Sequence, residues 1–228
     1  MKSPFIMHIQ ESHSWDLSPQ QAVELQKQLC GQIICRDKLG SVHIVGGIDV
    51  AYLGEGKIAC AAVVALSFPE LMLKEIVLAQ KPVRLPYIPG LLSFRETPVI
   101  LDALAKLSTS PDLLICDGHG LAHPRRFGLA CHLGLLTGLP SIGVAKSLLV
   151  GAHDPVAEAA GSWQLLLDGG EVIGAALRTR VGTKPVFVSI GHRLSLKTAI
   201  DYVLHLTAGY RLPEPIRLAH LHASKQSN

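Results

Sequence analysis

The spacing of apolar residues changes along the chain between an alternating and a helical pattern, and these changes predict the order of the secondary-structure elements. Ser18 and Pro19 are residue types that begin a helix, and apolar residues at helical spacing follow as far as Leu29. Beyond this helix, apolar positions recur with the two-residue period of strands. We expect three strands, at about 44–52, 58–66 and 72–78, with the first two joined as a hairpin.

The rest of the chain alternates between strands and helices after a proline-rich loop. Thr97 and Pro98 indicate the start of a helix that continues through Leu107. Further strands are expected at about 113–116, 141–144, 163–167, 172–177 and 186–190, and further helices at about 125–137, 195–206 and from Pro215 onward. This order predicts an α/β fold, with a mixed central sheet and helices on both faces. Residues 1–17 show no sustained periodicity.

Composition adds a size class and a compartment to this picture. The chain has 228 residues, of which 48% are hydrophobic and 17% charged, so we expect one globular domain over residues 1–228. A net charge of +3 permits an anionic partner without identifying one. The five cysteines lack paired spacing, and the sequence contains neither a secretion signal nor a membrane-length apolar run. We therefore expect a cytoplasmic protein that does not enter a membrane.

Three acidic residues stand at positions where a carboxylate is unusual. Asp49 lies within the first strand, on the face opposite Ile48 and Val50, and Asp117 directly follows a buried strand. Glu96 comes just before the expected helix start at Thr97. Taken singly, they also fit a hydrogen-bonded strand aspartate, a cap of the following loop and a surface acid near a helix start. If they converge, their charges require divalent cations, and Mg²⁺ prefers such oxygen ligands.

The segment 117–126, with the sequence DGHGLAHPRR, carries the densest group of chemically active side chains. Its histidines can bind a metal or a phosphate, and its arginines can pair with phosphate. Lys146 follows a short strand and could point at a phosphate, although a solvated lysine is the simpler interpretation. His220, in the last helix, could be a late metal ligand, although most helical histidines are not.

The segment Pro86–Gly90 places Tyr87 and Ile88 between Pro86 and Pro89. The prolines restrict the backbone, so both side chains could be held stiffly at a loop tip, where apolar wedges separate stacked bases. A hydrophobic loop folded onto the core is the alternative.

Taken together, five strings spread from about residue 15 to residue 222 resemble the endonuclease V family. They are VGGIDVAY, LPYIPGLLSFRE, DGHGLAHPRRFGLACHLG, IGVAKS and RLPEPIRLAHLHA. The resemblance implies a ribonuclease H-like fold and a DNA repair endonuclease that uses Mg²⁺, with Mn²⁺ as a substitute. It further implies hydrolysis of the second phosphodiester bond on the 3′ side of deoxyinosine, which leaves 3′-hydroxyl and 5′-phosphate ends.

The resemblance also assigns roles to individual residues. Asp49, Glu96 and Asp117 match the family's metal-binding acids, and His220 matches a position where some members have histidine and others an acid. Tyr87 matches the wedge. Backbone groups around Gly90, Leu92 and Gly118 would line a pocket for the flipped hypoxanthine, while His123 and Lys146 would support the phosphate region.

Two other functions are compatible with the same residues. The chain could cleave inosine-containing RNA, because no motif reports on contacts to a 2′-hydroxyl. It could also be a lesion-binding module that does not cut, although the full set of acids argues against this. The sequence indicates no obligate protein partner.

Overall fold

A computed structural model of the protein describes residues 13–227, and the expectation for residues 1–17 falls largely on residues 1–12, which lie outside it. The helices are α1 (Pro19–Cys30), α2 (Leu92–Leu104), α3 (Leu129–Thr137), α4 (Leu196–His205), α5 (Glu214–Ser224) and the short 3₁₀ helix η1 (Lys225–Ser227). The strands are β1 (Ile44–Leu53), β2 (Ile58–Ser67), β3 (Leu73–Pro82), β4 (Leu113–Asp117), β5 (Ser141–Ala145), β6 (Trp163–Asp168), β7 (Glu171–Leu177) and β8 (Val186–His192).

All of these strands form one sheet in the order β3-β2-β1-β4-β5-β8-β7-β6. The β1–β4 and β4–β5 pairs are parallel, and the other neighbouring pairs are antiparallel. The carboxyl ends of β1, β4 and β5 therefore lie at one end of the sheet, which is where open α/β sheets place ligands.

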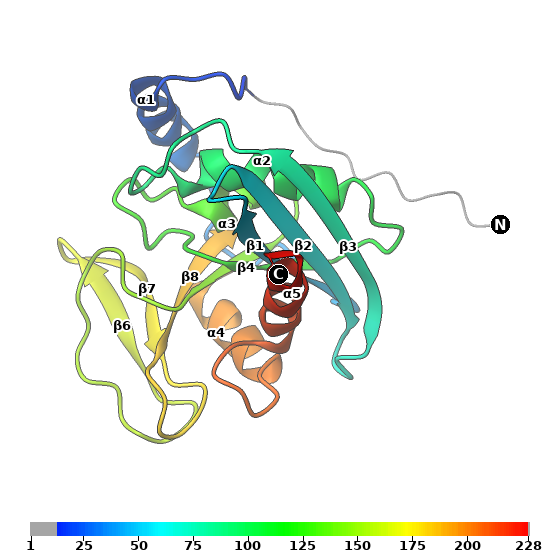
Figure 1. Ribbon diagram of the computed structural model, residues 1–228. Helices are drawn as coiled ribbons and strands as arrows, with labels where there is room; N and C mark the ends of the chain where they lie inside the picture. Colours follow the sequence, from blue (N-terminus) through cyan, green and yellow to red (C-terminus); the bar gives the residue numbers. More distant parts are fainter. Residues whose placement is uncertain (1–12, 228) are drawn as a thin grey trace.

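Helices cover both faces of the sheet, as the sequence predicted (Figure 1). Ile48 of β1 packs in a core cluster with residues of α2 and α3, whereas Val45 of the same strand packs in a second cluster with α4 and α5. Helix α1 lies further out, against the start of α2, through Ala22 and Phe94. Among the described residues, no helix is long and apolar enough to cross a membrane.

The first helix begins as predicted. Ser18 accepts a hydrogen bond from the Gln21 backbone N–H, the Gln21 side chain bonds back to the Ser18 backbone, and Pro19 occupies the first turn. This reciprocal pair satisfies two backbone donors that a helix start leaves free.

Two predicted helix starts are wrong. Helix α2 begins at Leu92, not at Thr97, so Glu96 lies inside the helix and Pro98 is tolerated within it. A proline there removes one backbone hydrogen bond, but burial of neighbours such as Val99 and Ile100 offsets the loss. Helix α3 begins at Leu129 instead of about 125. The preceding residues form a loop because Arg126 has a left-handed backbone, with φ 54°.

Close contact at one glycine sets the position of α5 on the sheet. A Cβ atom on Gly47 would lie 2.2 Å from the Pro215 carbonyl oxygen, so only glycine lets the start of α5 approach β1 this closely.

We expect Gly47→Ala to lower the free energy of unfolding by about 1–3 kcal/mol in urea denaturation, because the helix must shift. Gly40→Ala is the control, since a Cβ there meets nothing within 4 Å. Equal stability of the two variants would contradict this account of the contact.

Candidate active site

Two aspartates lie side by side where β1 and β4 run in parallel. Ile48 of β1 is paired with Cys116 of β4, so the next residues, Asp49 and Asp117, follow on neighbouring strands. Asp49 is 9% exposed, and Asp117 is the last residue of β4. The alternation of β1 places Asp49 on the face opposite Ile48, as predicted from the sequence. The parallel register therefore brings two carboxylates together in a place with little water.

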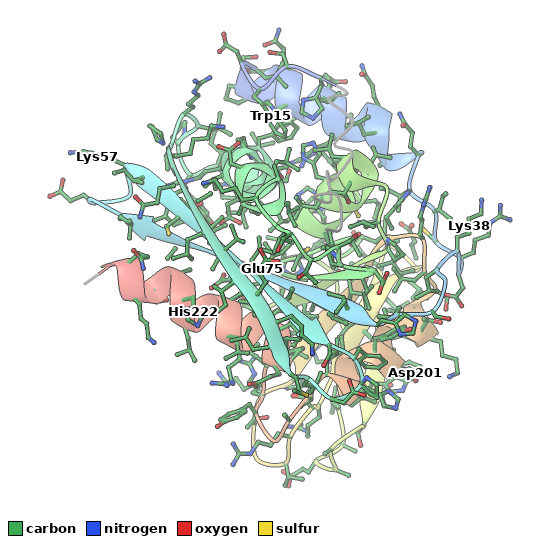
Figure 2. The ribbon with its side chains drawn as sticks, turned by 90° about the vertical axis from the view of Figure 1, so that its right-hand side faces the viewer. Trp15, Lys38, Lys57, Glu75, Asp201 and His222 are labelled. Carbon is green, nitrogen blue, oxygen red and sulfur yellow. The ribbon has the colours of Figure 1, made fainter. Side chains whose placement is uncertain are left out.

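The third member of the group comes from the far end of the chain. His220 on α5 lies with its Nδ1 2.7 Å from Asp49 Oδ2. One ligand atom each from Asp49, Asp117 and His220 all lie within 4.8 Å of one another. Figure 2 shows α5, with His222 labelled, on the side of the sheet opposite α1 and Trp15. The close approach at Gly47 is thus what allows the histidine to reach the first aspartate.

The charges of Asp49 and Asp117 act on the carboxyl group of Glu96. Glu96 is not one of the three residues whose possible ligand atoms lie within 4.8 Å of one another. It is 6% exposed, and the Tyr52 hydroxyl donates to its Oε1 at 2.9 Å. The Arg95 guanidinium stacks over the Tyr52 ring at 4.3 Å. Burial, with the nearby charges of Asp49 and Asp117, raises the pKa of Glu96 to about 8, against the opposing effect of the Tyr52 hydrogen bond.

The same causes act on Asp49. Burial first, and then the neighbouring Asp117, raise its pKa to about 6, while the hydrogen bond from His220 opposes the shift. Lys146 supplies the nearest fixed positive charge, with its Nζ 2.5 Å from Asp117 Oδ2. With the pKa of Glu96 at about 8, the charges at neutral pH come mainly from Asp49 and Asp117, and one lysine cannot balance both.

These donors suit a divalent cation. Carboxylates and one imidazole are ligands that Mg²⁺ and Mn²⁺ accept. Burial first, and then the neighbouring carboxylates, raise the pKa values of Asp49 and Glu96, so a bound cation would favour their ionised forms. Asp49, Asp117 and His220 could hold the ion, and the carboxyl group of Glu96 interacts with the charges of both aspartates.

A cavity of about 200 Å³ is formed by the loop before α2, the segment after β4 and the segment after β5. Among the residues assigned to DNA binding by the sequence, Tyr87, Ile88, Gly90 and Leu92 line it. Pro86, Pro89 and Gly118 do not. The Tyr87 side chain is 68% exposed, so the aromatic ring stands free in solvent instead of packing on the core.

The cavity also has two histidines in its wall, His119 and His123. Burial lowers the pKa of each to about 4, so both rings are neutral at neutral pH. His123 is 3% exposed, its Nε2 donates to the Gly90 carbonyl at 2.9 Å, and its Nδ1 accepts from the Arg125 backbone. His123 therefore holds the loop before α2 that contains Gly90, called the Gly90 loop below, and both of its ring nitrogens are already hydrogen-bonded. Neither nitrogen is free to bind a phosphate.

Three side chains converge on the Gly90 carbonyl oxygen. Besides His123, Arg125 Nη2 donates at 2.7 Å and Gln26 Nε2 at 3.0 Å. Gln26 also donates to the Phe127 carbonyl, which joins α1 to the loop before α3. The Gly90 loop is thus fixed by side chains from two other segments.

The sequence interpretation missed Gln26 and Tyr52. Gln26 is fully buried on the same face of α1 as Ala22 and Leu29, and a polar residue on an apolar helix face was a signal that something there accepts its hydrogen bonds. Tyr52 had no comparable signal, because its partner Glu96 lies far away in sequence.

Comparisons with known proteins agree with this geometry. The family model described as endonuclease V matches residues 27–221. Endonuclease V of Nostoc sp. is 53% identical over 221 residues, covering 96% of this chain and 100% of the relative. The crystal structure of endonuclease V from Streptomyces avermitilis is similar with a TM-score of 0.88 at 42% identity, over 97% of each chain.

A second similar structure contains nucleic acid. Endonuclease V of Ciona intestinalis, in complex with a 23mer DNA containing an inosine followed by a ribo-adenosine, has a TM-score of 0.82 at 31% identity, over 92% of this chain and 98% of that chain. These likenesses confirm the ribonuclease H-like architecture. The chain therefore belongs to the endonuclease V family and is a nuclease.

Proposed function

We propose that the protein is a Mg²⁺-dependent repair endonuclease that recognises deoxyinosine and hydrolyses the second phosphodiester bond on its 3′ side, leaving 3′-hydroxyl and 5′-phosphate ends. The observation that carries the proposal is the meeting of Asp49, Asp117 and His220 within 4.8 Å, with Lys146 bridging from the cavity side to Asp117. The inosine-containing DNA in the Ciona intestinalis complex supports the choice of lesion.

The chemistry divides between the cation and the protein side chains. When bound, a divalent cation supplies an activated water and charge stabilisation at the scissile phosphate. Lys146 has a flexible ammonium that can move from Asp117 to a phosphate oxygen once the ion neutralises the carboxylates. In its ionised form, Glu96, oriented by Tyr52, can hold a water molecule and accept its proton.

Base recognition is assigned to the cavity. Its volume of about 200 Å³ is enough for a flipped purine, and its wall offers backbone groups at Gly90 and Leu92. The three hydrogen bonds to the Gly90 carbonyl hold this part of the wall in place. Tyr87, at the cavity wall and mostly exposed, would occupy the gap that the base leaves in the stack.

Cleavage of inosine-containing RNA is the second candidate. The DNA bound to the Ciona intestinalis protein has a ribo-adenosine directly after the inosine. The Ciona intestinalis protein therefore accommodates a ribose at this position. Matched DNA and RNA strands with one inosine each separate the two candidates, and we propose faster cleavage of DNA.

The first prediction concerns the acid at the end of β4. Asp117→Asn should lower the nicking rate of an inosine oligonucleotide by about 1,000-fold or more, because the loss of one metal ligand costs several kcal/mol of transition-state stabilisation. It should also abolish the rise in unfolding temperature that Mn²⁺ causes. Asp102→Asn is the matched control, since Asp102 pairs with Lys81 on the surface. Near-normal nicking by the Asp117 variant at saturating Mg²⁺ would refute the assignment.

The second prediction follows from the raised pKa of Glu96, about 8 in the folded protein against a usual value of 4.5. In the fold, Glu96 keeps its proton to higher pH than in the unfolded chain. Its contribution to stability is therefore complete below about pH 4.5 and is lost as the pH rises through 8. In EDTA, the unfolding free energy of the wild type should fall over this interval relative to Glu96→Gln. Parallel pH profiles of the two proteins would show that Glu96 is not buried as described.

Cation binding should have the opposite pH dependence. A divalent ion displaces the protons of Asp49 and Glu96, so Mn²⁺ affinity, measured by calorimetry, should increase between about pH 6 and pH 8.5. Glu96→Gln should remove the upper part of this increase. An affinity that does not change with pH would contradict the proposed ligand set.

Another prediction distinguishes a wedge from an acid–base role at Tyr87. Its exposed ring, not its hydroxyl, should support base flipping, so Tyr87→Phe should be mild and Tyr87→Ala severe. The Ala defect should be largest on paired duplex and smaller on single strands, where there is less stacking to interrupt. Nicking rates of both variants on both substrates provide the test. A Phe variant as impaired as the Ala variant would assign the function to the hydroxyl.

A further inference from the structure

The loop between β7 and β8, residues 178–185, is held in one conformation by an arginine that points inward. Arg178 donates to three backbone carbonyls: from Nε to Ala157 at 2.7 Å, from Nη2 to Val156 at 2.9 Å, and from Nη1 to Thr183 within the loop itself. The Thr183 hydroxyl also donates to the Arg180 carbonyl at 2.8 Å. This loop is therefore stabilised by hydrogen bonds where it has little apolar surface to bury.

A second arginine ties the loop to the candidate active site. Arg211, in the segment before α5, donates from Nε to the Lys184 carbonyl at 2.8 Å and from Nη2 to the Pro185 carbonyl at 2.9 Å. The same Nη2 donates to the Lys146 carbonyl at 2.7 Å. The loop and the backbone that carries the Lys146 ammonium thus share one guanidinium group.

Strand pairing places this loop at the carboxyl end of the central strands. Strands β5 and β8 are antiparallel, with Ala145 opposite Phe187, so Lys146 leaves β5 beside the point where the loop enters β8. Asp117 pairs with Val144 of the same strand. The loop consequently lies at the same end of the sheet as Asp117 and the neighbouring Asp49 and His220.

The side chains that the loop exposes carry positive charge. Arg180 and Lys184 are both exposed, and Val181 between them is 61% exposed. Within residues 13–227, no carboxylate lies within 4 Å of either cation, as is also true of the exposed lysines Lys74 and Lys106 far from the site. Two inward arginines therefore fix a loop that presents two cations without acidic partners next to Lys146.

We propose that the loop 178–185 binds the phosphate backbone of substrate DNA beside the cleavage site, through Arg180 and Lys184. This proposal rests on the proposed function for the substrate, and it assigns to the loop a contact that does not read the base. Phosphate contacts position a strand and carry no sequence information, so the loop adds affinity equally to damaged and undamaged DNA. Arg178 and Arg211 act as positioning residues for it.

The experiment compares Arg180→Ala/Lys184→Ala with a control that removes the same charge elsewhere. Lys74→Ala/Lys106→Ala is suitable, because both lysines are exposed. Their neighbours in sequence, Glu75 and Ser108, are hydrogen-bonded to each other. Strand pairing places Glu75 near the amino end of β1, away from Asp117. Figure 2 labels Glu75 on β3. Binding to an inosine duplex and to the matched adenine duplex is measured by fluorescence anisotropy in EDTA over a range of KCl concentrations, and unfolding temperatures confirm that each variant folds.

The loop variant should bind both duplexes more weakly, with an unchanged ratio of inosine to adenine affinity. The slope of log Kd against log salt concentration should decrease by about 1–2, that is by about 0.9 for each lost phosphate contact. The control should keep the wild-type slope. A loop variant with the wild-type slope, or a control with an equal loss, would overturn the proposal. A wild type without inosine preference would instead contradict the proposed function, while the slope on the adenine duplex would still test the loop.

Discussion

The parallel pairing of β1 with β4 is the constraint on which the rest of the site depends. It places Asp49 and Asp117 on neighbouring strands at the same level of the sheet, where little water reaches Asp49. Two carboxylates in that position repel each other and are costly to ionise. Two neighbouring groups reduce this cost, because His220 hydrogen-bonds to Asp49 and Lys146 forms an ion pair with Asp117. The pKa of Asp49 is nevertheless raised. The negative charge that remains is what a divalent cation would neutralise.

Glycines and buried polar side chains bring distant segments to this pair. The bare Cα of Gly47 lets α5 approach β1, so a histidine from the last helix reaches an aspartate from the first strand. On the other side, Gln26, His123 and Arg125 fix one carbonyl of the loop that carries Tyr87. Hydrogen bonds and close packing thus hold both the pocket wall and the acidic residues in place, as preorganised catalysis requires.

The sequence was most informative where local pattern and chemistry coincide. Asp49 interrupts an alternating strand and Asp117 ends an apolar one, so both could be placed on the sheet before the fold was known. Glu96 could be singled out but not placed, because Thr97-Pro98 imitates a helix start inside a helix that begins at Leu92. Burial of the apolar residues around Pro98 outweighs its local preference, and burial depends on the tertiary fold.

Contacts between distant segments could not be predicted from the pattern. The hydrogen bond from Tyr52 to Glu96 and those from Arg211 to Lys146 and Lys184 depend on how the strands are ordered in the sheet.

The most direct test of the central claim is anomalous diffraction from crystals soaked in Mn²⁺ at a concentration that supports nicking. The account predicts an anomalous peak within bonding distance of Asp49, Asp117 and His220. A crystal that binds Mn²⁺ elsewhere, with no peak between these residues, would contradict it.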